Sequence, residues 1–173
     1  EYGIVYDPNL KPQNTRSYEL GADISFFNNL VSINYTYSRQ NVKDQIFEVP
    51  LASSTGSSSF MTNGGKIHTN AHELTVNINP IRWNIGINWS KIDNYVDELA
   101  PGVESIFLGG FTTPQVRAGI GDKFPVIYGV SYARDDNGNL IVDEDGVPMA
   151  GKDDVIGKVS PDFILGFNTN LRL

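Results

Sequence analysis

The chain has 173 residues, of which 40% are hydrophobic, and its 13 lysines and arginines against 20 aspartates and glutamates give a net charge of −7. The absence of cysteine excludes a disulfide framework and thiolate metal sites, and the acidic balance argues against nucleic acid as a partner. The acidic excess lies in one segment, since residues 93–154 carry twelve acidic and four basic side chains.

The first predicted element is a hairpin over residues 17–40. Residues 17–26 place apolar side chains in strict alternation with polar ones, which predicts a strand with one apolar and one polar face. The length of this segment matches the roughly 9–11 residues that a tilted strand needs to cross a bilayer. After the Asn28-Asn29 turn, residues 31–38 alternate in the same way, so a second strand returns beside the first.

A second hairpin is predicted over residues 72–95 and a further strand over 163–173. Residues 72–79 and 83–90 alternate on either side of a turn at Pro80, and the last strand repeats the pattern. These long strands share one period, which predicts an all-β, antiparallel sheet.

The connections between these strands alternate in length. Only a few residues join the strands within each hairpin, whereas residues 41–71 and 96–161 form long loops. Short turns on one side and long loops on the other are typical of outer-membrane barrels, whose long loops are extracellular. In the second loop, residues 124–134 and 139–143 are predicted to form a hairpin, because the Asn-Gly dipeptide between them is a strong hairpin signal.

The predicted fold is therefore an antiparallel transmembrane β-barrel wall segment with long extracellular loops. The strand length, the one-sided short turns and the polar faces rich in Asn, Ser, Thr and Gly favour it. Aromatic side chains would mark the two membrane interfaces, with Phe26, Phe27 and Trp83 on the periplasmic side and Tyr18, Tyr37, Trp89, Tyr95 and Phe163 on the extracellular side.

The stretch PNLKPQNTRSYELG at residues 8–21 resembles the signature that opens a C-terminal barrel section in SusC/RagA-like TonB-dependent outer-membrane transporters of Bacteroidetes. Further stretches resemble motifs of this family in the same order. They lie at residues 26–56, 61–80, 83–99, 126–148 and 156–173. The resemblance thus covers nearly the whole chain.

The resemblance implies a nutrient importer in the bacterial outer membrane, built as a plugged barrel of about 22 strands. It also implies a SusD-like surface lipoprotein as a lid, TonB acting on the plug, and an oligosaccharide or a peptide as substrate. Residues 1–173 would then be a partial β-barrel domain that faces outer-membrane lipid. We expect the plug domain and the terminal strands to lie outside this sequence.

The candidate site residues are polar and aromatic side chains placed to contact a solute. Amides on the inward face offer donors and acceptors that suit hydroxyl-rich solutes, and side chains on the loop hairpin would stack on, or hydrogen-bond to, a sugar ring or a peptide. These candidates are Asn34, Asn77, Asn88 and Asn168 in the lumen, and Tyr128, Tyr132 and Arg134 on the loop.

The sequence contains no catalytic constellation, so we expect a protein that is not an enzyme and needs no cofactor. His68 and His72 lie four apart on a predicted strand, too far from each other for easy shared zinc ligation. The turn that begins at Asp135 lacks the glycine and the glutamate of an EF-hand loop, so no metal site is expected there.

Two other functions remain open from the residues alone. A soluble β-sandwich that binds carbohydrate would bury the apolar faces internally and fold without detergent. An outer-membrane adhesin or structural barrel would keep the same wall but would have no plug domain and no role in transport.

Overall fold

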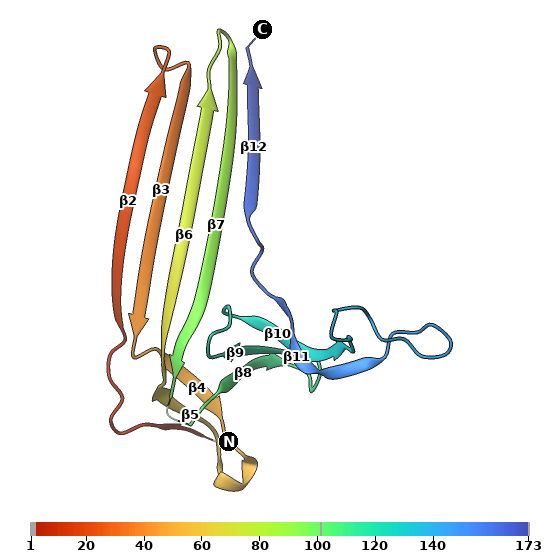
Figure 1. Ribbon diagram of the computed structural model, residues 1–173. Helices are drawn as coiled ribbons and strands as arrows, with labels where there is room; N and C mark the ends of the chain where they lie inside the picture. The colour runs from red at the N-terminus through yellow and green to blue at the C-terminus, as the bar shows by residue number, and fades with distance from the viewer. Residues whose placement is uncertain (1–2, 101, 173) are drawn as a thin grey trace.

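The computed structural model describes residues 3–100 and 102–172. In these residues the regular elements are β-strands, apart from the short 3-10 helix η1 (Ser53–Thr55), which confirms the predicted all-β class. Figure 1 shows long strands standing side by side as a wall, with smaller sheets gathered near one end. In the described part of the chain, no helix is long and apolar enough to cross a membrane.

The wall is a five-stranded antiparallel sheet in the order β12-β7-β6-β3-β2. Its strands are β2 (Asn14–Phe26), β3 (Val31–Lys43), β6 (Gly65–Ile78), β7 (Trp83–Leu99) and β12 (Ile164–Leu171). The β2–β3 and β6–β7 pairings continue past the limits 17–40 and 72–95 that the sequence predicts. The additional β2–β3 pairs, such as Asn14 with Lys43, are mostly polar, so the alternation of apolar residues does not reveal them.

Both hairpins of the wall turn at the same end, away from the smaller sheets (Figure 1). The β2–β3 turn places Phe27, Asn28 and Asn29 at φ angles of 54°, 54° and 66°. Asparagine tolerates this left-handed region better than most residues, which explains the pair of asparagines at the turn. The long connections leave from the opposite end of the wall, as Figure 1 shows.

The long connections and the residues before β2 contain short strands. A three-stranded sheet consists of β1 (Gly3–Tyr6), β5 (Ser57–Asn63) and β4 (Ile46–Pro50), with β1 and β5 parallel. A four-stranded antiparallel sheet, here called the loop sheet, consists of β8 (Ser105–Gly110), β9 (Gln115–Gly119), β10 (Val126–Tyr132) and β11 (Ala150–Lys158).

The main partner of β10 differs from the sequence prediction. Residues 139–143 contribute only isolated bridges, such as Arg134 with Leu140, whereas β10 pairs along its length with β11. The sequence of β11, AGKDDVIGK, carries three successive charged residues and no alternating pattern. The predicted hairpin is confirmed only next to its turn, where Arg134 bridges Leu140 and the backbone N–H of Ile141 donates to Ala133 O. The Asn-Gly signal reports on this local turn and not on the distant partner β11.

The register gathers the apolar residues of the wall on one face, here called the outer face. Its middle row consists of Ile24, Ile33, Val76, Ile87 and Phe167. Side chains on this face remain exposed, Leu20 to 74% and Phe167 to 67%. No second sheet therefore covers the face in the described part of the chain, which contradicts the soluble β-sandwich.

A small core joins the wall to the loop strands. It consists of Phe47, Ile67, Val96, Leu99, Ile106 and Ala118. Ile67 and Val96 are register partners on the polar face of the wall, here called the inner face, and Val96 is fully buried at 0% exposure. The loop strands β4, β8 and β9 thus pack against the inner face at the end of the wall.

Candidate functional site

The four candidate asparagines lie together on the inner face of the wall. Asn77 and Asn168 are both register partners of Gly86, while Asn34 and Asn88 share a partner in the next row. Gly86 leaves room for Asn168, since a Cβ at this glycine would lie 2.3 Å from Asn168 Oδ1. The structure therefore brings the four amides into one polar patch, here called the amide patch.

Cross-strand hydrogen bonds orient two of these amides. Asn34 Nδ2 donates to Asp23 Oδ1, and Thr75 Oγ1 donates to Asn88 Oδ1 at 3.1 Å. An amide that is already held in place loses less conformational entropy when it binds a ligand. The amide patch is thus an ordered polar surface that offers donors and acceptors.

The three loop candidates lie on, or just beyond, β10 in the loop sheet. The guanidinium of Arg117 lies over the ring of Tyr128, with its Cζ 4.8 Å from the ring centroid. Arg134 Nη1 donates to Gly138 O at 2.6 Å and so helps to close the turn after β10. Tyr132 is 62% exposed. Two of the three candidates therefore have structural contacts, and Tyr132 presents its ring to solvent.

The wall candidates and the loop candidates belong to different sheets. The amide patch lies on the five-stranded wall, whereas β10 belongs to the loop sheet, which projects sideways from the loop end of the wall (Figure 1). The structure thus separates the candidate residues into two regions instead of assembling a single pocket.

Arg117 is a candidate that the sequence pattern did not reveal. Its Nε is buried and has no hydrogen-bond partner among the described residues. The same side chain lines a cavity of about 270 Å³ together with Glu104 and Asp122. Arg117 is the single basic residue between Lys91 and Lys123, a signal that could have singled it out. Its guanidinium can donate to an acceptor group that enters this cavity.

Two acidic turns follow β10 in the chain. Asp135 Oδ1 accepts hydrogen bonds from the backbone N–H groups of Asn137, at 2.9 Å, and Asn139, at 2.8 Å. The amide side chain of Asn139, followed by its backbone N–H, holds the pKa of Asp135 below its usual value. Asp143 caps the next turn in the same way. These carboxylates serve the geometry of the turns.

The sequence matches a known family and curated proteins. The family model described as TonB dependent receptor-like, beta-barrel matches residues 1–164. TonB-dependent receptor P3 of Formosa agariphila is 27% identical over 194 residues, covering 95% of this chain and 19% of that protein. TonB-dependent receptor P26 of the same organism is 26% identical over 204 residues, covering 98% and 20%. The chain thus spans about a fifth of the length of these relatives.

Solved structures share the fold. A chain of the RagAB peptide importer in the closed-closed state superposes with a TM-score of 0.70 at 18% identity, over 95% of this chain and 20% of that chain. The open-open state of RagAB gives a TM-score of 0.66 at 18% identity, over 96% and 20%. At this identity the likeness concerns the fold alone.

Proposed function

Because the chain belongs to the TonB dependent receptor-like β-barrel family, we propose that it forms a wall segment and extracellular loops of a transporter that imports glycan fragments or peptides. The resemblance to SusC/RagA-like receptors carried by the sequence motifs is confirmed by the curated relatives and by the fold shared with RagAB. The family is one of receptors and not of enzymes. Its members are outer-membrane proteins, so the chain belongs to the outer membrane of a Gram-negative bacterium.

The separation of the two faces of the wall carries this proposal. The outer face presents exposed apolar rows, and Trp83 and Trp89 stand near the two ends of these rows, as aromatic girdles do. The inner face carries the amide patch. Lipid on one side and water or a plug on the other is the arrangement that such a wall fits.

The substrate is proposed to be an oligosaccharide or a peptide. Amide groups and the Tyr132 hydroxyl suit sugar hydroxyls and peptide groups alike. RagAB is described as a peptide importer, which supports a peptide. The acidic segment 93–154 disfavours strongly anionic solutes. The proposed partners are TonB, through the plug domain of the longer protein, and a SusD-like surface lipoprotein over the loops.

Uptake by intact cells tests this proposal. Deletion of the gene for the longer protein should abolish energy-dependent uptake of fluorescent oligosaccharides or of fluorescent peptides, and deletion of TonB should have the same effect. Passive entry of a small solute through porins serves as the control and should not change. If uptake of both substrate classes persists without the longer protein, transport is contradicted and an adhesin or structural barrel is favoured.

A further inference from the structure

The outer face changes from apolar to cationic toward the end of the wall that carries the loops. Beyond the next row, which contains Leu20 and Tyr37, most positions on the same face are polar and include several basic side chains. These are Arg16 on β2, Arg39 and Lys43 on β3, and Lys66 on β6. Arg39 lies four residues past Tyr35, or about 14 Å along the strand. With aromatic residues at the interface, this is the level of lipid headgroups.

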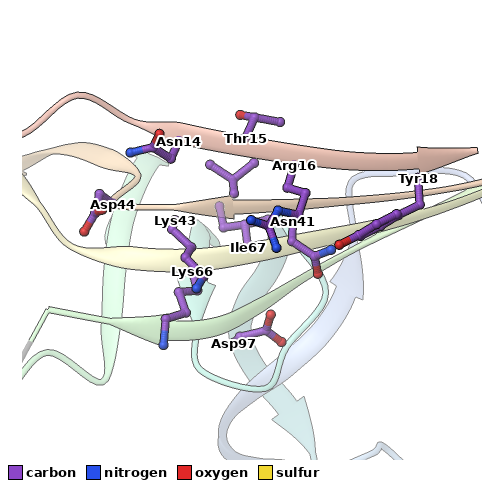
Figure 2. A pocket seen from close by; sticks show the side chains of 11 residues that line it. Asn14, Thr15, Arg16, Tyr18, Asn41, Lys43, Asp44, Lys66, Ile67 and Asp97 are labelled. Atoms are coloured by element: carbon purple, nitrogen blue, oxygen red, sulfur yellow. The ribbon is translucent and has the colours of Figure 1, made fainter.

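A cavity of about 520 Å³ lies among these side chains. Figure 2 shows the ring of Tyr18, the guanidinium of Arg16 and the amide of Asn41 pointing toward one another, with Lys66 on the same side of the strands. Arg39, the register partner of Tyr18, stands beside this cavity on the outer face. The site therefore combines several hydrogen-bond donors with an aromatic ring.

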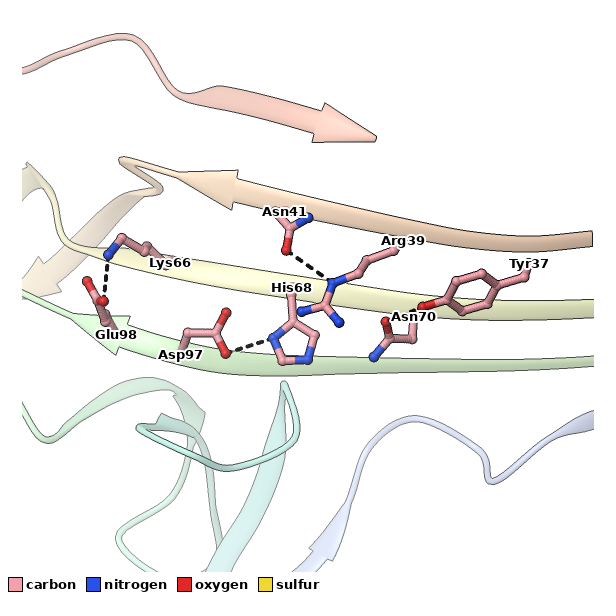
Figure 3. A network of polar contacts seen from close by, with 8 residues as sticks. All are labelled: Tyr37, Arg39, Asn41, Lys66, His68, Asn70, Asp97 and Glu98. Atoms are coloured by element: carbon pink, nitrogen blue, oxygen red, sulfur yellow. Dashed lines mark hydrogen bonds and ion pairs between the residues drawn. The ribbon is translucent and has the colours of Figure 1, made fainter. Parts of the chain in front are cut away.

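Two carboxylates on β7 near this cavity already have side-chain partners. Glu98 Oε1 lies 2.5 Å from Lys66 Nζ, and Asp97 Oδ1 lies 2.7 Å from His68 Nδ1 (Figure 3). Because Glu98 and Asp97 are already engaged, neither carboxylate pairs with Arg16, Arg39 or Lys43.

Arg16, Arg39 and Lys43 have no carboxylate within 4.0 Å in the part of the chain that the structure describes. Arg39 Nε donates to Asn41 Oδ1 at 3.4 Å, a long contact that leaves most of its guanidinium donors for a ligand (Figure 3). Asp44 is the remaining carboxylate that lines the cavity. The local balance is therefore cationic and suits an anion.

We propose that Arg16, Arg39 and Lys43, beside the ion-paired Lys66, form a site on the outer face for the phosphate group of an outer-leaflet glycolipid. Arginine guanidinium groups match phosphate oxygens in bidentate hydrogen bonds, and Lys43 adds positive charge. A lipid is the occupant that the position favours, because its acyl chains would cover the apolar rows directly below its headgroup. The inference rests on the proposed function only in taking the loops as extracellular.

Binding of fluorescent lipid A to the purified full-length protein in detergent tests this site. The test variant combines Arg16→Gln, Arg39→Gln and Lys43→Gln. Each of these three substitutions should contribute a loss of about fivefold in lipid A affinity. Lys152→Gln, on exposed β11 and ion-paired with Asp154, is the matched control and should leave binding unchanged. Heat-modifiable gel mobility checks that each variant is folded. If the triple variant does not assemble, the single variant Arg16→Gln is used instead, because Arg16 is exposed and its replacement should not disturb folding.

Equal binding by the variant and the unchanged protein, or equal affinity for dephosphorylated lipid A, would overturn the inference. Displacement of lipid A by inorganic phosphate at a similar concentration would also overturn it, because the site would then be one for free phosphate. Substrate uptake should be the same in cells that carry the variant. Loss of lipid binding with intact uptake therefore separates this inference from the proposed function.

Discussion

Replacing Ile87 by arginine is expected to lower the stability of the membrane-inserted barrel by about 2–4 kcal/mol, the cost of an arginine on a lipid-facing strand at the bilayer midplane. Ile87 lies in the middle row of the outer face, where Val76 and Phe167 are its register partners. Lipid offers the guanidinium no hydrogen-bond partner at this depth. The measurement is the urea midpoint of the full-length protein folded into lipid vesicles, read by heat-modifiable gel mobility.

Asn88→Arg, one residue farther along β7, is the matched control. Asn88 belongs to the inner face, where a charged side chain reaches water, so its replacement should change stability by no more than about 0.5 kcal/mol. Similar destabilisation by both variants would contradict the assignment of lipid to one face only.

Val96→Asp is expected to detach the loop strands from the wall, at a cost of about 3–5 kcal/mol for a buried carboxylate without a partner. Val96 is fully buried in the core cluster, which joins β7 to Phe47 on β4 and to Ile106 on β8. Only the loop ends of β6 and β7 belong to this core, so the rest of the wall keeps its register pairs. Local opening of the loops is therefore expected without loss of the barrel.

Limited proteolysis of intact cells measures this detachment. Cleavage within residues 105–158 should become faster in Val96→Asp, while the heat-modifiable band of the barrel is retained. Val130→Asp on β10, where the valine is 48% exposed, is the control and should leave cleavage unchanged. Unchanged cleavage in Val96→Asp would show that the small core does not hold the loops.

The two faces of the wall could be predicted from the sequence because a strand has a period of two. Alternation in residues 17–26 and 83–90 determines which side chains share a face. A register slip by one residue would turn apolar side chains to the polar side, so the pairing of Ile24 with Ile33 follows from the same pattern. For the same reason, the four asparagines of the amide patch could be assigned to one face.

The loop sheet could not be predicted in the same way. Its strands are short, and β11 carries successive charges on an exposed surface, so burial imposes no pattern on its sequence. The contact between Arg117 and Tyr128 depends on the register of β9 against β10, which no local signal specifies. The cationic site near Arg16 was also missed, since its residues come from three strands and converge only in the folded wall.

Accessibility of spin labels along β7 tests the two-faced wall most directly. The chain contains no cysteine. A series of variants, each with one cysteine at a successive position from 84 to 90, therefore places a single spin label in this segment. In the full-length protein in lipid vesicles, labels at Ile85, Ile87 and Trp89 should be accessible to oxygen dissolved in the lipid. Labels at the intervening positions should instead be accessible to a water-soluble nickel complex. An oscillation of period two with the opposite phase, or uniform access to the nickel complex, would contradict a wall with lipid on its outer face.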